Sequence, residues 1–376
     1  MEWVDANGAG SSIEITRRNA YPLMVGRGKL ASLPSLLASI AETDSVFIVT
    51  DDHVAPIYLD RTVALARSAG LSVKSVAIPQ GELSKSWNVA ERLLATLASD
   101  GAKRRTILLA LGGGVLCDLV GFVASIFMRG VPYVNVPTTL MAQLDAAIGG
   151  KTGIDFHGSK NLVGSFYHPC AVLVDPALLT TLPRREIRSG LAEAIKVGIL
   201  RPALFERLER FGSSWNGDTD AIDPIVRETI AGKLQLLRDD PFERSLLRLL
   251  NLGHTVGHAL ESATDFVGYR HGEAVAIGIA VAAQVSRLRG FCGPDVCERI
   301  ANCLRNCALP ILLPEEHATA TWRELDVIRR IRNGRLNEVL PVTIGQCEIV
   351  DEVATDDYVR AVRSLYESVS DPGREP

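Results

Sequence analysis

The N-terminal half of the chain alternates short apolar runs with amphipathic helical stretches, and this alternation restricts the fold more than any other feature. The apolar runs lie at residues 45–50, 72–78, 106–111 and 133–136, and the helical stretches between them end near residues 69 and 98. This β–α–β order predicts a mostly parallel sheet with helices on both faces. A ligand crevice is then expected beyond the carboxyl ends of the strands.

The pattern changes after about residue 175. From there, helical periodicity dominates, with segments at 185–199, 223–237, 246–264 and 273–289. A chain of 376 residues is long enough for two domains of roughly 150 residues or more. We therefore predict an α/β domain at 1–175 and a mainly α-helical domain at 176–376.

Charge and composition exclude several classes of protein. The 40 Lys and Arg residues nearly balance the 44 Asp and Glu residues, so there is no overall charge that would favour nucleic acid. Residues 1–12 hold two acids and no apolar core, and the apolar run at 274–285 is too short to cross a bilayer. We expect a cytoplasmic protein that binds neither nucleic acid nor membrane.

The cysteines do not form a recognisable metal pattern. Cys292, Cys297, Cys303 and Cys307 lie close together, but their spacings match no C-x-x-C zinc motif. We interpret them as buried thiols on helices, and a redox or metal cluster is the alternative.

A glycine-rich segment, Gly112-Gly113-Gly114, comes directly after an apolar run and directly before a helical one, with Asp118 four residues on. Glycines allow the backbone to approach a pyrophosphate, and the N–H groups that open the helix can bind its oxygens. The segment is not the G-x-G-x-x-G fingerprint. A tight strand-to-helix turn explains the segment alone equally well.

Three histidines form the sharpest pattern. His254 and His258 lie four residues apart on one predicted helix face, and His271 follows. Glu193 stands on another predicted helix, with Lys196 three residues on. One carboxylate and two imidazoles form a suitable catalytic metal set with open positions for substrate. The alternative for each histidine is a hydrogen-bonded structural role.

Several cations lie among glycines and apolar residues rather than in a polar run. They are Arg129, Lys151 and Lys160, the last followed by Asn161. This setting suits cations that face a phosphorylated substrate in a cleft. Solvated surface lysines are the alternative, and Asp145 near Lys151 allows a purely structural ion pair.

Further short motifs accompany these residues in a fixed order. The full series is Gly112-Gly113-Gly114 with Asp118, Met128-Arg129-Gly130, Val136-Pro137-Thr138-Thr139-Leu140, Gly149-Gly150-Lys151-Thr152, Lys160-Asn161, Gly190-Leu191-Ala192-Glu193 and the three histidines. Over residues 21 to 353, the series resembles the 3-dehydroquinate synthases and the wider sugar phosphate cyclase family. The resemblance implies an α/β N-terminal nucleotide-binding domain, a mainly α-helical C-terminal metal-binding domain and a homodimer.

The resemblance also implies a cofactor chemistry. Bound NAD oxidises a substrate hydroxyl, phosphate is eliminated, the hydride returns, and the opened product closes by an intramolecular aldol addition. The enzyme class is then a carbon–oxygen lyase that needs NAD and a divalent metal, zinc or cobalt.

The roles that the resemblance implies divide into three sets. The metal ligands are Glu193, His254 and His271. The NAD-binding residues are Asp51, Glu82, Lys85, Gly113, Gly114, Asp118, Thr138, Thr139, Thr181 and Glu186. The substrate-binding and proton-handling residues are Asp145, Lys151, Lys160, Asn161, Lys196, Lys233, Asn251 and His258, with Arg129 reaching the phosphate of a neighbouring subunit.

Two positions depart from the 3-dehydroquinate synthase pattern. That family places an arginine for the substrate carboxylate four residues before Asn251, where this chain has Leu247. Arg248 is adjacent, but one residue turns a helix by about 100°, so we expect it to point elsewhere. The family's Asp-Lys-Lys near the C-terminus is replaced by Ile328-Arg329-Arg330.

These departures leave the substrate open. A seven-carbon ketose phosphate of the 3-dehydroquinate synthase type is our first expectation. A sugar phosphate that lacks the carboxylate, such as sedoheptulose 7-phosphate, or an amino analogue is the alternative. Enzymes that form 2-deoxy-scyllo-inosose typically carry Glu at the Asn251 position, and valiolone-forming cyclases usually lack the imidazole of His258. Outside the cyclases, a metal-dependent polyol dehydrogenase and a non-catalytic binding relative remain alternatives.

Overall fold

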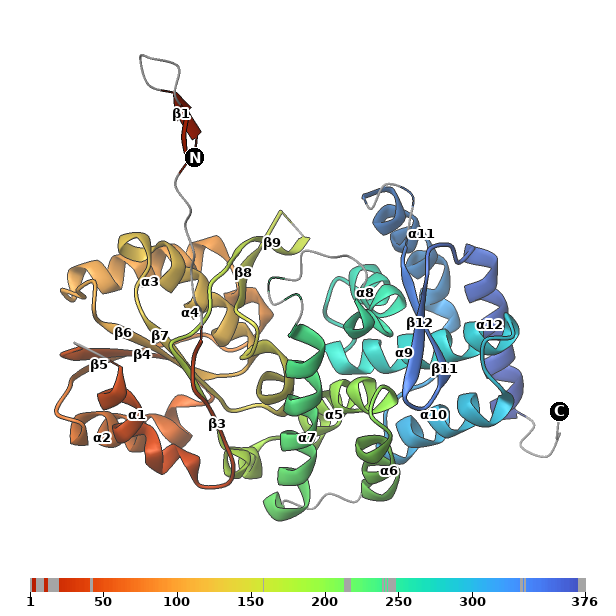
Figure 1. The fold of residues 1–376 in the computed structure, drawn as a ribbon, viewed down its shortest axis with the longest axis horizontal. Coiled ribbons are helices and arrows are strands. Elements are labelled where there is room, and N and C mark those ends of the chain that lie inside the picture. Colours follow the sequence, from red (N-terminus) through yellow and green to blue (C-terminus); the bar gives the residue numbers. More distant parts are fainter. Residues whose placement is uncertain are drawn as a thin grey trace.

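The structure is a computed structural model that describes residues 2–4, 10–12, 20–40, 43–157, 159–212, 218–238, 240, 242, 248–331, 334 and 336–370. Figure 1 shows a sheet domain formed by the first half of the chain beside a helical domain formed by the second half. The predicted fold class is confirmed. In the described part of the chain, no helix combines the length and the apolar character that crossing a membrane requires.

A six-stranded parallel sheet forms the N-terminal domain, in the order β3-β10-β7-β6-β4-β5. The predicted apolar runs become β4, β5, β6 and β7 within one residue, and β5 is an edge strand of the sheet. The bounds are β3 Leu23–Val25, β4 Ser45–Asp51, β5 Ser72–Ile78, β6 Ile107–Gly112, β7 Tyr133–Pro137 and β10 Ala171–Val174. The predicted domain boundary after residue 175 follows β10 and stays a prediction.

Helices cover both faces of this sheet because its buried strands carry apolar side chains on both sides. In β4, Phe47 and Val49 pack on one face with α3 and α4, whereas Val46 and Ile48 pack on the other with α1 and α2. The helices are α1 Leu33–Ser39, α2 Asp60–Ser68, α3 Trp87–Ser99 and α4 Gly114–Ile126. The α4 helix therefore begins directly at the carboxyl end of β6.

Short elements connect the strands, and a hairpin extends from the sheet domain toward the helical domain (Figure 1). The hairpin consists of β8 Lys151–Phe156 and β9 Ser159–Phe166, which pair antiparallel. The other short elements are β1 Glu2–Val4, β2 Gly10–Ser12, η1 Lys29–Ser32, η2 Ala55–Leu59, η3 Glu82–Ser84, η4 Phe127–Arg129, η5 Ala142–Ala146, η6 Pro176–Thr181 and η7 Leu249–Asn251.

The C-terminal domain packs its helices around α9, which is buried along most of its length. The helices are α5 Arg184–Ile199, α6 Pro202–Phe211, α7 Thr219–Leu237, α8 His254–Ala263, α9 His271–Leu288, α10 Pro294–Asn306, α11 Glu315–Ile331 and α12 Thr355–Ser370. A hairpin of β11 Glu338–Thr343 and β12 Gln346–Val350 also packs on α9.

Glycines allow α5, α8 and α9 to approach one another closely. A Cβ atom on Gly272 of α9 would lie 1.8 Å from the carbonyl oxygen of Ser189 in α5. A Cβ atom on Gly278 would lie 1.9 Å from the carbonyl oxygen of Gly253, which precedes α8. Any side chain at these positions would separate the helices that carry the predicted metal ligands.

The structure corrects two sequence expectations. The helix expected from residue 246 begins only at His254, because Arg248 is extended and Gly253 has a φ of 77°. We expected Arg248 to point away because a helix would turn it by about 100° from Leu247, but Arg248 does not lie on a helix, so this reason is wrong. Leu247 lies outside the described residues. Cys297 and Cys303 are buried on α10 as expected, whereas Cys307 is buried just after this helix and Cys292 is half-buried in the segment before it.

Candidate active site

Two cavities meet between the domains. The first, of about 520 Å³, lies beyond the carboxyl ends of the sheet strands, where an α/β fold binds its ligand. The second, of about 480 Å³, lies beside it between the β8–β9 hairpin and the α8 and α9 helices. His271 lines both cavities, so a ligand bound to its imidazole would lie where the two cavities meet.

The first cavity collects most of the residues predicted to bind NAD. Gly113 caps α4, whose first turn opens toward this cavity, and a Cβ atom there would lie 3.2 Å from the Thr139 side chain. The backbone N–H groups are therefore accessible to an anionic ligand. The predicted residues that line it are Asp51, Glu82, Gly113, Gly114, Thr138, Thr139, Thr181 and Glu186.

Lys85 and Asp118 were also predicted to bind NAD, but neither lines the first cavity. They form a buried ion pair with an Nζ–Oδ2 distance of 2.5 Å, and Lys85 also donates to Asn161. Asp118 and Asn161 line the second cavity. The pair thus joins η3, α4 and β9 at the wall between the two compartments.

The second cavity collects the cations and imidazoles predicted for the substrate. The predicted residues that line it are Asp145, Lys151, Asn161, Lys233, His254, His258 and His271, with Asp118. Among the described residues of this lining, the basic side chains are lysines and histidines, and none is an arginine. Phe166 contributes an apolar patch to the same wall and contacts Phe242 edge-on, at 6.1 Å between ring centroids.

Three predicted substrate residues line neither cavity. Lys196 is buried against Glu193 on α5. Asn251 is half-buried in η7, and Arg129 is exposed in η4 with a φ of 64°. Lys160, also predicted for the substrate, lines the first cavity instead.

The predicted metal ligands converge from three helices. Oε1 of Glu193 lies 3.7 Å from Nε2 of His254 and 3.7 Å from Nε2 of His271. That oxygen is buried and has no hydrogen-bond partner. A buried carboxylate oxygen without a hydrogen-bond partner is energetically costly. Each imidazole nitrogen lies from this oxygen at about the distance between two ligands of one metal ion, so the set fits a divalent cation.

The three imidazoles form an overlapping candidate set. His254, His258 and His271 each offer a nitrogen, and these atoms lie within 4.8 Å of one another. His258 is exposed, and its ring centroid lies 5.1 Å from that of His254. The unpartnered oxygen of Glu193 favours the predicted set, and His258 lines the second cavity beside it.

Nearby charges determine the ionisation of two carboxyls of the site. Burial opposes the charged form of Glu193, but Lys196 and the two imidazoles outweigh it and lower its pKa. Burial likewise opposes ionisation of Asp145, whose pKa is nevertheless lowered by Lys233, Lys196 and Lys151. Both groups are therefore carboxylates at neutral pH.

Lys233 is held by oxygen atoms of the η5 segment. Its Nζ lies 2.7 Å from Oδ1 of Asp145, 2.7 Å from the Asp145 carbonyl oxygen and 3.2 Å from the Ile148 carbonyl oxygen. Its side chain is only 7% exposed. Asp145 therefore pairs with Lys233, whereas the sequence suggested Lys151 as its partner, and its role toward the substrate stays a prediction.

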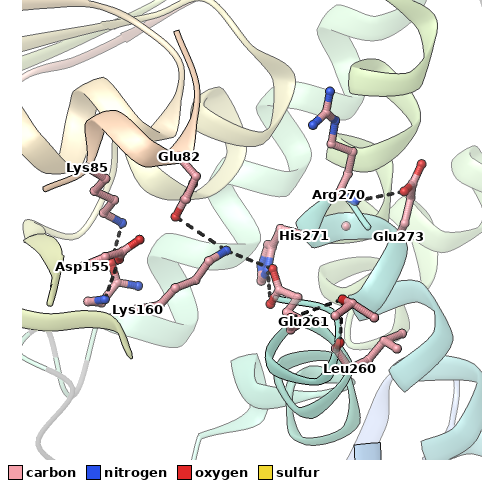
Figure 2. A network of polar contacts seen from close by, with 12 residues as sticks. Glu82, Lys85, Asp155, Lys160, Leu260, Glu261, Arg270, His271 and Glu273 are labelled. Atoms are coloured by element: carbon pink, nitrogen blue, oxygen red, sulfur yellow. Dashed lines mark hydrogen bonds and ion pairs between the residues drawn. The ribbon is translucent and has the colours of Figure 1, made fainter. Parts of the chain in front are cut away.

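Sequence reasoning missed Glu261, which links the two cavities. Figure 2 shows its carboxylate between His271 and Lys160, whose ammonium group also approaches Glu82. A signal was present, because Glu261 follows His254 by seven residues and His258 by three, which places all three on one face of α8.

A cleft at the carboxyl ends of the strands meets a carboxylate–imidazole cluster that fits a divalent cation, beside a cavity lined by lysines, as the resemblance to the sugar phosphate cyclases implies. Residues 75–189 match the 3-dehydroquinate synthase N-terminal family, and residues 190–327 match the 3-dehydroquinate synthase C-terminal family. The chain belongs to the 3-dehydroquinate synthase family of sugar phosphate cyclases.

Three relatives illustrate its place in that family. The chain is 46% identical to a 2-epi-valiolone synthase of Stigmatella aurantiaca, over 94% of this chain and 91% of the relative. It is 39% identical to a 3-dehydroquinate synthase of Symbiobacterium thermophilum, over 89% and 95%. The solved 2-epi-5-epi-valiolone synthase of Streptomyces hygroscopicus, with NAD⁺ and Zn²⁺ bound, is 30% identical and superposes with a TM-score of 0.86 over 95% of this chain and 99% of that one.

Proposed function

We propose that this enzyme is a phosphate-eliminating carbon–oxygen lyase that cyclises sedoheptulose 7-phosphate to a valiolone-type product. Leu247 carries the proposal, because it replaces the arginine that would hold a substrate carboxylate. The greater identity to a 2-epi-valiolone synthase than to a 3-dehydroquinate synthase supports the same choice. This reverses our first expectation from the sequence, which favoured a carboxylate-bearing substrate. The proposal also departs from the usual valiolone-forming pattern at His258, whose imidazole those cyclases usually lack.

The cofactors that we propose are NAD in the first cavity and one zinc or cobalt ion at Glu193, His254 and His271. When bound, NAD would supply a reversible hydride transfer and the ion would polarise a substrate oxygen. The first turn of α4 provides backbone donors for the pyrophosphate. Since His271 lines both cavities, its position brings the proposed metal site next to the nucleotide compartment.

The lysines and imidazoles of the second cavity would bind the substrate and move its protons. Lys151 and Asn161 reach this cavity from β8 and β9 and suit the phosphate. His258 lies beside the metal set and suits proton transfer to a substrate oxygen. Asp145 and Lys233 would hold the η5 wall in place.

The test compares phosphate release from sedoheptulose 7-phosphate with release from the carboxylate-bearing substrate of 3-dehydroquinate synthase, with the product identified in each case. We expect turnover of the first and little of the second, without net accumulation of NADH. Preferred turnover of the carboxylate substrate would refute the proposal. Net NADH formation without phosphate release would instead indicate the polyol dehydrogenase.

Two adjacent substitutions test the carboxylate position. Leu247→Arg should improve use of the carboxylate substrate, because a charged hydrogen bond contributes roughly 1.5 to 3 kcal/mol, or about tenfold to more than a hundredfold. Arg248→Leu is the matched control and should leave the preference unchanged. A large loss of carboxylate use in Arg248→Leu would mean that Arg248 performs the arginine's role.

We also propose a homodimer in which Arg129 reaches the neighbouring subunit. Arg129 is exposed at a positive φ in η4, beside the exposed apolar side chain of Met128. Light scattering would give the mass in solution. Mixing Arg129→Ala with a Lys151→Ala variant should restore activity by subunit exchange if the residue acts across the interface, and a persistently inactive mixture of dimers would contradict that role.

A further inference from the structure

Glu261 is a buried carboxylate that touches a proposed metal ligand without facing the metal position itself. Its side chain is 2% exposed on α8, and Oε2 lies 3.2 Å from Nδ1 of His271. Its other oxygen, Oε1, lies 3.2 Å from Nζ of Lys160. Each oxygen therefore has its own partner (Figure 2).

The bond to Glu261 determines which nitrogen of His271 carries the proton. Since an ionised carboxylate can only accept, Nδ1 must be the donor, and the lone pair of a neutral ring is then on Nε2. That nitrogen lies 3.7 Å from the unpartnered Oε1 of Glu193. The hydrogen bond thus orients the ring and leaves the correct nitrogen available to an ion.

His254 is oriented in the same way by a different group. Its Nδ1 lies 3.2 Å from the carbonyl oxygen of Leu252, so Nε2 again faces Glu193. No side-chain substitution removes that backbone acceptor. The orientation of His271, in contrast, depends on the side chain of Glu261, so a substitution of Glu261 can test it.

Packing between the helices does not require this carboxylate. Gly257 of α8 already lies against Ala274 of α9, since a Cβ atom there would be 3.1 Å from the Ala274 carbonyl oxygen. Burying a charge is costly, whereas an apolar residue would fill the same space without that cost. The partners of Glu261 point instead to a role at the meeting point of the two cavities.

We propose that Glu261 is a positioning residue that fixes the tautomer and orientation of His271 for the metal ion. Lys160 balances the buried charge of Glu261 and also approaches Oε1 of Glu82 at 3.6 Å. The proposal rests on the metal set of the proposed function. Carboxylates that orient a metal-binding imidazole typically raise metal affinity by 10-fold to 100-fold.

The test measures Co²⁺ affinity by competition with a chelator, together with the visible absorption spectrum of the Co²⁺-loaded protein. Glu261→Gln should bind Co²⁺ about tenfold or more weakly, and Glu261→Ala more weakly still. Glu338→Gln is the matched control, because Glu338 is also buried, bonds to Tyr358 at 2.7 Å and lies on β11. The control should match the wild-type affinity and spectrum.

Glu193→Ala separates failure of this proposal from failure of the metal assignment. If Glu193→Ala loses Co²⁺ while both Glu261 variants bind within about threefold of wild type with an unchanged spectrum, the positioning role is wrong and the metal set stands. If Glu193→Ala itself keeps wild-type affinity, the metal set is wrong and the positioning role is wrong with it. Circular dichroism of each metal-free variant verifies that the compared proteins are folded. If Glu261→Ala does not fold, the Co²⁺ affinity and spectrum of Glu261→Gln, which preserves the side-chain size, decide the test.

Discussion

The buried pair of Lys85 and Asp118 leads to a quantitative prediction about stability. The side chains are 5% and 18% exposed, and the ammonium group also bonds to Asn161. Lys85→Met removes the cation and leaves a largely buried carboxylate. Breaking a buried pair in this way costs about 3–5 kcal/mol, and the partial exposure of Asp118 favours the lower value of about 3 kcal/mol.

The loss should depend on pH. Burial raises the pKa of Asp118, and Lys85 opposes that rise, so removing Lys85 raises the pKa further. An unfolded Asp ionises near its ordinary pKa of about 3.9, and the folded carboxyl ionises only at higher pH. Between these values the folded state holds more protons, so stability falls as pH increases, by at most about 1.4 kcal/mol per pH unit.

The assay is urea unfolding near pH 5 and near pH 8, followed by tryptophan fluorescence, to which Trp87 contributes from the start of α3 in the same domain. Lys85→Met should lose more stability at the higher pH, and adding Asp118→Asn should remove most of that dependence. Lys103→Met is the control, because its ion pair with Asp44 is exposed on both sides and should matter little. Equal losses for Lys85→Met at both pH values would refute the reasoning.

Three further predictions concern packing, the η5 wall and the metal. Gly272→Ala should destabilise the protein by about 1–3 kcal/mol and weaken Co²⁺ binding, since its Cβ atom would lie 1.8 Å from the Ser189 carbonyl oxygen; an unchanged melting temperature and affinity would contradict it. Asp145→Asn should cost about 1.5–3 kcal/mol in urea unfolding at neutral pH, because it removes a charge-assisted hydrogen bond from the buried Lys233 ammonium group to a carboxylate that is 37% exposed, and wild-type stability would show that the carbonyl oxygens suffice. Zn²⁺ at about 100 times its dissociation constant should stabilise the metal-free protein by about 2.7 kcal/mol in the same assay, and no shift would argue against a metal site in the native state.

Much of the fold was predictable because its signals are local. The strand at 72–78 was predicted with its observed bounds, and the helices around Glu193 and His271 were predicted within a few residues. The start of α8 was not, because Gly253 adopts a left-handed conformation that depends on its close contact with α9. Likewise, the sequence places Glu261 on one helix face with His254 and His258, but only the structure shows its buried partners, His271 and Lys160.

The sequence by itself determined the alternation of strands and helices, the residue types of the site and the family, because periodicity and motif spacing are properties of the chain. Only the tertiary structure decided which side chains meet. Glu193 and His271 lie far apart in the sequence, yet close glycine contacts between α5 and α9 bring their functional atoms to 3.7 Å. Tertiary packing also determined the partners of Lys85, Lys160 and Lys233. A cation that is removed from water needs an opposite charge beside it, and the packing of the helices and strands determines which carboxylate lies there.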